Sequence, residues 1–91
     1  MRRALIVDDD RNIATTLRVY LEDKGLEVIV ASSATEGLQA FRREAPDIVI
    51  LDMKLPDGSG LDLLKEIVAT SPATQVVMIT AYATIETAVQ A

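Results

Sequence analysis

Cysteine, histidine and tryptophan are all absent from this sequence of 91 residues. Without thiolates or imidazoles, the chain can form neither a disulfide nor a zinc site of the usual kind. It also has no cysteine nucleophile and no serine–histidine pair. Any chemistry must therefore use carboxylates, hydroxyls, amines, backbone groups or a bound metal that prefers oxygen ligands.

Long apolar segments and an excess of positive charge are also missing. The longest apolar runs, such as residues 48–51, have four members, whereas a membrane-spanning helix needs about 20. The first residues lack the apolar stretch of a secretory signal peptide. The net charge of −5 is the opposite of what an isolated nucleic-acid-binding module needs. We therefore expect a cytoplasmic protein that contacts neither a membrane nor nucleic acid directly.

What the sequence does contain is four short apolar runs that alternate with segments of helical periodicity. The runs are continuously apolar, which is typical of parallel strands covered by helices on both faces. The order βαβαβαβα predicts a single α/β domain with a doubly wound parallel sheet. The strands are predicted at residues 5–7, 28–30, 48–51 and 76–79, and the helices near 11–24, 33–45, 61–71 and from 84 onward.

Local signals mark where these elements begin and end. Gly25 suits the left-handed residue that follows a helix. Ser33 and Glu36 have the spacing of a capping box at the start of a helix. Residues 56–60, Pro-Asp-Gly-Ser-Gly, are a strong turn signal. The residues predicted to share one face of the first helix are Ile13, Leu17, Tyr20 and Leu21.

Acidic and hydroxyl side chains follow three of the predicted strands. Asp8, Asp9 and Asp10 follow the first strand. Asp52 ends the third strand, and Thr80 ends the fourth. Ligands of open parallel sheets bind outside the carboxyl ends of the strands. In the strand order 2-1-3-4, the first and third strands are neighbours, so their carboxylates would converge in one crevice.

Carboxylates that share a crevice repel one another, so either their pKa values rise or a cation joins them. Oxygen ligands without histidine or cysteine favour Mg²⁺. Asp52 could then attack phosphorus as a carboxylate nucleophile and become an acyl phosphate, to which Thr80 could donate its hydroxyl. Each residue also has a simpler interpretation: Asp10 as a helix cap, Asp52 as a turn residue and Thr80 as an ordinary strand end.

Three segments resemble the receiver domains of two-component response regulators. They are residues 5–10 (Leu-Ile-Val-Asp-Asp-Asp), residues 48–60, which contain Asp52 and the turn signal, and residues 76–81 (Val-Val-Met-Ile-Thr-Ala). They occur in the order of that family, and the likeness spans essentially all of residues 1–91. The resemblance implies a flavodoxin-like fold and a phosphoacceptor domain rather than an enzyme.

The resemblance also implies a role for each candidate residue. Asp52 would be phosphorylated by a partner histidine kinase and would bind Mg²⁺ together with Asp9 and the backbone carbonyl of Lys54. Asp8 would act through a metal-bound water or as a further ligand. Thr80 would contact the phosphoryl group and shift the loop that follows it.

Residues 80–89 further resemble the nitrogen-regulatory subgroup, whose members usually continue into an ATPase and a DNA-binding domain. We therefore expect a transcriptional output domain in a longer parent protein. The resemblance also implies a fifth strand, which carries a lysine for the phosphoryl group, and a fifth helix, and residues 1–91 include neither. We expect the 91-residue chain to be a shortened receiver domain that self-associates or swaps elements to cover its exposed apolar face.

Two other functions are open at this stage. Asp8 and Asp10 have the Asp-x-Asp spacing of haloacid-dehalogenase-like phosphatases, which use these residues as nucleophile and general acid. Asn12, however, stands where those enzymes have threonine or valine. The second alternative is a receiver-like module that dimerises without phosphotransfer.

Overall fold

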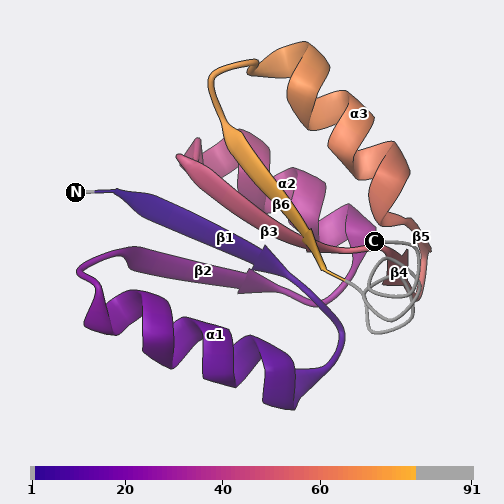
Figure 1. Ribbon diagram of the computed structural model, residues 1–91. Helices are drawn as coiled ribbons and strands as arrows, with labels where there is room; N and C mark the ends of the chain where they lie inside the picture. The colour runs from indigo at the N-terminus through magenta and orange to yellow at the C-terminus, as the bar shows by residue number, and fades with distance from the viewer. Residues whose placement is uncertain (1, 80–91) are drawn as a thin grey trace, which may run out of the picture.

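Four parallel strands form the centre of the protein in a computed structural model, which describes residues 2–79 (Figure 1). The strand order is β2-β1-β3-β6, so β6 takes the place of the predicted fourth strand and the expected order 2-1-3-4 is confirmed. All three strand pairs are parallel. The strands are β1 (Arg3–Val7), β2 (Glu27–Ala31), β3 (Ile48–Asp52) and β6 (Gln75–Ile79).

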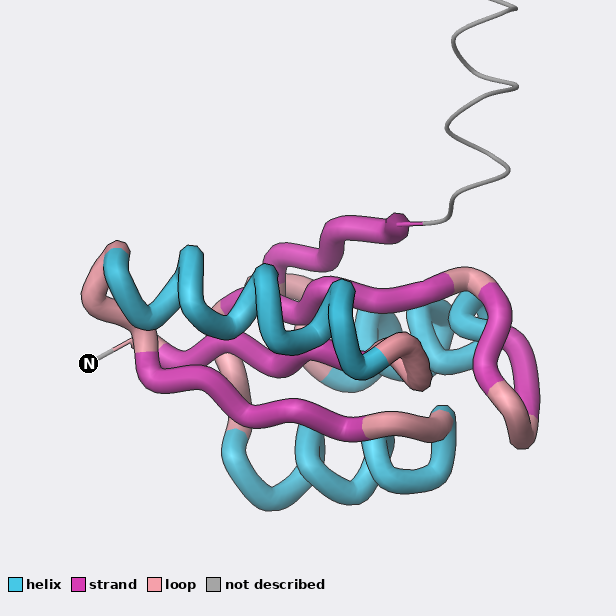
Figure 2. The backbone as a smooth tube through the Cα atoms, turned by 90° about the horizontal axis from the view of Figure 1, so that it is seen from below, coloured by secondary structure: helices cyan, strands magenta, loops and turns pink. Residues whose placement is uncertain are grey.

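Helices lie on both faces of this sheet (Figure 2), which confirms the doubly wound arrangement. The first helix, α1 (Arg11–Asp23), covers one face, and α2 (Ala34–Glu44) and α3 (Gly60–Thr70) cover the other. No helix among residues 2–79 is long and apolar enough to cross a membrane. The fourth predicted helix and Thr80 lie outside the described residues.

The apolar side chains of each strand divide between two cores. Because side chains alternate along a strand, Leu5 and Val7 of β1 join the larger core, which α2 and α3 complete. Ile6 points to the other face and packs with Ala14 of α1 and Ile50 of β3. The continuously apolar strands are thus explained, since both faces of the sheet are covered.

The predicted face of α1 is only partly correct. Leu17 and Leu21 pack against the smaller core, but Ile13 and Tyr20 are 42% and 59% exposed. The reason is that Ala14, Leu17 and Leu21 form one stripe along the helix, with spacings of three and four residues. Ile13 and Tyr20, seven residues apart, form a second stripe beside it, which lies outside the smaller core.

The predicted ends of the first two helices are largely confirmed. Gly25 has a φ of +88° and follows the last turn of α1. Ser33 is the N-cap that precedes α2, and its hydroxyl oxygen accepts the Glu36 N–H at 3.1 Å. The Glu36 carboxylate accepts from the N–H and hydroxyl of Ser32 rather than from the N–H of Ser33. The capping box is therefore shifted by one residue on its glutamate side.

The predicted turn at residues 56–60 is part of a small hairpin that the sequence did not reveal. β4 (Lys54–Leu55) pairs with β5 (Gly58–Ser59) in antiparallel fashion, and Leu55 is buried in the larger core. The hairpin begins directly after Asp52 and Met53 and ends at α3. A Cβ on Gly60 would lie 1.9 Å from the backbone oxygen of Asp52, so only glycine fits there.

Candidate functional site

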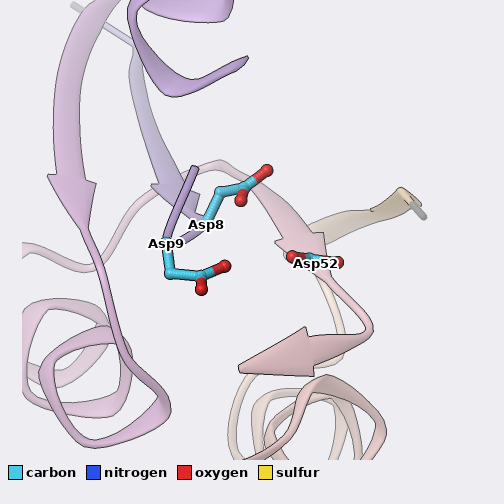
Figure 3. A group of neighbouring side chains, drawn as sticks. All are labelled: Asp8, Asp9 and Asp52. Atoms are coloured by element: carbon cyan, nitrogen blue, oxygen red, sulfur yellow. The ribbon is translucent and has the colours of Figure 1, made fainter. Parts of the chain in front are cut away.

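The ends of β1 and β3 bring three carboxylates together, as predicted. Val7 pairs with Leu51, so Asp8 and Asp52 follow directly at the same edge of the sheet. One carboxylate oxygen each of Asp8, Asp9 and Asp52 lies within 4.8 Å of the others. Figure 3 shows the three side chains around one space at these strand ends. Asp8 is buried, Asp9 is exposed, and Asp52 is intermediate.

Within this cluster, Asp8 has a raised pKa. Burial raises the pKa of its carboxyl group above the ordinary value, and the charges of Asp52, Asp9 and Asp10 raise it further. The Asp10 N–H, which donates to Asp8 Oδ1 at 2.9 Å, acts in the opposite direction but does not cancel these effects. The ionised form of Asp8 is therefore costly by itself, and a bound cation would remove that cost.

The donor set fits a small hard cation. Magnesium–oxygen distances are about 2.1 Å, so two oxygens on opposite sides of the ion lie about 4 Å apart. The three carboxylate oxygens lie within 4.8 Å of one another, which is close to that separation. Lys54, whose carbonyl is the predicted fourth protein ligand, donates its N–H to Asp52 Oδ1 at 3.3 Å. Its backbone therefore lies beside the cluster.

Asp10 and Thr80 are not part of the described cluster. The Asp10 carboxylate caps α1, since Oδ1 accepts the N–H groups of Asn12 at 2.9 Å and Ile13 at 3.2 Å. The simpler interpretation of Asp10 is therefore confirmed. Thr80 lies outside the described residues, and the last residue before it, Ile79, pairs with Asp52. Ile79 also accepts the Met53 N–H at 3.2 Å.

One residue near the site was not identified from the sequence. Asp57, in the turn between β4 and β5, hydrogen bonds across 22 and 23 residues to the start of α2. The Thr35 hydroxyl and the N–H groups of Thr35 and Ala34 donate to it, and they lower the pKa of its carboxyl group. The sequence indicated only that residue 57 lies in a turn, because no local pattern encodes so distant a partner.

Comparisons with known proteins agree with this geometry. Residues 4–91 match the family model of the response regulator receiver domain. The response regulator protein PilR of Pseudomonas aeruginosa is 43% identical over 90 residues, which are 99% of this chain and 20% of that protein. A CheY-like receiver domain protein from Methanospirillum hungatei has a TM-score of 0.87 and 38% identity, and the match covers 98% of this chain and 71% of that one.

A third comparison includes a signalling partner. The response regulator protein TrrA, solved in complex with the histidine kinase ThkA, has a TM-score of 0.81 and 36% identity; the match covers 90% of this chain and 71% of that one. The chain spans about a fifth of the length of the curated relatives it matches. These relatives also support the predicted nitrogen-regulatory subgroup. The chain therefore belongs to the family of response regulator receiver domains of two-component systems.

Proposed function

We propose that Asp52 accepts a phosphoryl group from a histidine kinase and that residues 1–91 are the receiver part of a longer regulator. The observation that carries this proposal is the convergence of Asp8, Asp9 and Asp52 at the ends of β1 and β3. Asp52 is less buried than Asp8, so its carboxylate is the more accessible nucleophile of the two.

The transfer exchanges one bond to phosphorus for another. A carboxylate oxygen of Asp52 attacks phosphorus while the bond between phosphorus and the kinase imidazole nitrogen breaks. The imidazole leaves with the bonding electron pair, and Asp52 becomes an acyl phosphate. Asp8, Asp9, Asp52 and the Lys54 carbonyl would hold Mg²⁺, which when bound neutralises negative charge on the phosphoryl oxygens. Thr80 would donate its hydroxyl to the transferred group.

The relatives support a proposal for the partner and the output. TrrA was solved with a histidine kinase, and a kinase of that class is the partner we propose here. The matched relatives AlgB and ZraR are transcriptional regulatory proteins about five times as long as their matched segments. We propose that the parent protein works in the cytoplasm and carries a transcriptional output, with ATPase and DNA-binding domains. Hydrolysis of the acyl phosphate at Asp52 would be the only reaction of the receiver domain itself besides the transfer.

Labelling with acetyl phosphate in the presence of Mg²⁺ tests the proposal. The parent protein should gain one phosphoryl group, and peptide mass mapping should place it on Asp52. Asp52→Asn should abolish the label, whereas Asp47→Asn, at the other end of the sheet, should keep it. A label on Asp8 would instead support the phosphatase alternative, which the capping role of Asp10 already weakens. The absence of any label would contradict both.

We further propose that the 91-residue chain alone self-associates through β6. Among the described residues 2–79 this strand is an edge of the sheet, and Val77, which shares with Ile79 the sheet face on which α1 packs, is 50% exposed. A second copy could pair with this edge and cover Val77. In sedimentation experiments Val77→Lys should shift the chain toward monomer. Val68→Lys, at an equally exposed valine of α3, should not. A monomeric wild-type chain would contradict this proposal.

A further inference from the structure

The β4–β5 hairpin is attached to the rest of the protein differently at its base and at its tip. At the base, Met53 donates its N–H to Ile79 and accepts the Gly60 N–H at 2.9 Å. Between base and tip, Leu55 is buried in the larger core. At the tip, the Asp57 carboxylate reaches across to the start of α2. The backbone of Lys54, the predicted metal ligand, lies between these attachments.

Asp57 supplies the hydrogen-bond acceptors that the first turn of α2 needs. The first N–H groups of a helix have no partner within the helix. Asp57 Oδ1 accepts the Ala34 N–H at 2.7 Å, and Oδ2 accepts the Thr35 N–H at 3.0 Å and the Thr35 hydroxyl. Ser33 accepts the N–H of Glu36. Asp57 thus completes the cap, and its negative charge suits the positive end of the helix dipole.

The helix that Asp57 contacts is itself fixed against the strand that ends at Asp8. A Cβ on Gly37 would lie 2.9 Å from Val7 Cγ1 and 3.1 Å from Leu63 Cδ2. Val7 is fully buried and directly precedes Asp8. Contacts therefore connect the hairpin tip through α2 to β1. This connection is additional to the direct pairing of β3 with β1.

We propose that Asp57 is a positioning residue for the metal site: it holds the hairpin so that the Lys54 carbonyl meets the carboxylates of Asp8, Asp9 and Asp52. The inference rests on the proposed function, because Asp57 would position a ligand of the same proposed magnesium site without binding the ion. Asp57 does not touch the metal or the phosphoryl group. It sets the distance between ligands on two elements, β1 and the hairpin, both of which α2 contacts.

Magnesium affinity tests this inference without any phosphoryl transfer. Outer contacts of metal ligands are worth about 10–100-fold in affinity, and an exposed contact should lie at the low end. We expect Asp57→Ala to weaken Mg²⁺ binding about tenfold in calorimetric titration of the parent protein. Asp57→Asn, which keeps one oxygen acceptor, should weaken it less. Thr35→Val removes only the hydroxyl donor and should give the smallest loss.

A matched control separates positioning from a general loss of stability. Asp47 is also an exposed aspartate that accepts a backbone N–H, from Arg3 at 3.0 Å, but it lies at the far end of the sheet. Asp47→Asn should leave Mg²⁺ affinity within about twofold of wild type, because it alters no contact of the hairpin. Amide exchange of residues 54–59, measured without metal, should become faster in Asp57→Ala and stay unchanged in Asp47→Asn.

The outcomes distinguish the two proposals. If wild type binds Mg²⁺ and Asp52→Asn does not, but Asp57→Ala binds as wild type does, the positioning role is wrong and the proposed site stands. If Asp57→Ala weakens binding no more than Asp47→Asn, the effect is general and the inference is again wrong. If wild type binds no Mg²⁺, or binds it equally well after Asp52→Asn, the proposed site itself is wrong and the positioning role with it.

Discussion

At the amino end of the sheet Arg3 contacts three acidic residues, whereas at the carboxyl end three carboxylates face one another. Arg3 Nε lies 3.4 Å from a Glu27 carboxylate oxygen, and Nη1 lies 3.9 Å from one of Glu44. The Arg3 N–H donates to Asp47. Each of these acidic groups is matched by a donor that the fold provides, so its charge is compatible with folding.

The carboxyl end follows a different rule. Asp8, Asp9 and Asp52 gather negative charge around one space; burial raises the pKa of Asp8, and the neighbouring charges raise it further. Acidic residues therefore stabilise the fold at the amino end of the sheet and destabilise it at the carboxyl end. Clustered groups with perturbed pKa values often mark functional sites, and this cluster is the one for which we propose a cation and a phosphoryl group.

Replacing Asp52, the proposed phosphoacceptor, should have the largest effect on this comparison. Asp52→Asn removes the negative charge of the carboxylate that we propose as phosphoacceptor and metal ligand. We expect phosphorylation to be lost and Mg²⁺ affinity to fall at least about tenfold, because ligand charge sets the affinity of such sites. Mass spectrometry and calorimetry measure the two effects. Glu27→Gln at the opposite end should change neither phosphorylation nor Mg²⁺ affinity. Equal effects of the two variants would contradict the difference between the two ends of the sheet.

The close approach at Gly60 gives the next largest effect. In Gly60→Ala the new methyl group would meet the Asp52 backbone oxygen, so the loop must move. We expect a loss of at least about 3 kcal/mol in the free energy of unfolding, measured by urea denaturation. Gly58→Ala is the matched variant, because its Cβ would make only an ordinary contact at 3.7 Å from Ala34 Cβ. Similar losses for the two would contradict the tight packing at Asp52.

Neutralising one acid at each end should change stability in opposite directions. Without metal, Asp8→Asn relieves repulsion and burial of charge, and the remaining oxygen can still accept the Asp10 N–H. We expect it to raise the free energy of unfolding by about 1 kcal/mol while it weakens Mg²⁺ binding. Asp47→Asn weakens the hydrogen bond from Arg3 and should lower stability by up to about 1 kcal/mol. Changes of the same sign would refute the contrast.

The exposed ion pairs of Arg3 should contribute least. Glu27→Gln removes one of them, and exposed pairs are worth about 0–1 kcal/mol. We expect the free energy of unfolding to change by an amount near the lower limit, and we expect 1 M salt to abolish this change. Denaturation at low and high salt measures both values. A larger, salt-independent loss would mean that the amino end is held by Glu27 in another way.

The Asp57 contact should respond to pH with a definite sign. Its folded pKa lies below the ordinary 3.8, so the ionised carboxylate stabilises the fold above that value. This stabilisation is lost as the pH falls from 3.8 through the folded pKa. The stability difference between wild type and Asp57→Asn should therefore be constant at neutral pH and shrink in acid. A difference that grows in acid would mean that the Asp57 carboxylate is not the stabilising group.

The sheet and the cluster of carboxylates were predictable because several regular sequence signals agree with one another. Continuous apolar runs indicated parallel strands, and the parallel order then placed Asp8 and Asp52 at adjacent strand ends. The partner of each strand follows from general rules of connection, so no knowledge of individual contacts was needed.

The hairpin and the contact of Asp57 were not predictable for the opposite reason. Strands of two residues, such as Lys54–Leu55, are too short to show a period, and the turn residues around them obscure the pairing. The donors to Asp57 lie on α2, 22 and 23 residues away along the chain. Likewise, the helical period indicated which residues of α1 share a side, but not how wide a stripe the neighbouring strands cover.

The segment from Asp52 to Gly60 is held at its base by a backbone contact that excludes even a methyl group, and at its tip by Asp57. Loops usually accept insertions and deletions, but this one is fixed by close contacts at both its base and its tip. Its length should therefore be nearly invariant in proteins that keep the site. Insertions should instead fall in connections remote from it, such as those before β2 and β3, which makes those connections the natural places for tags or fused domains.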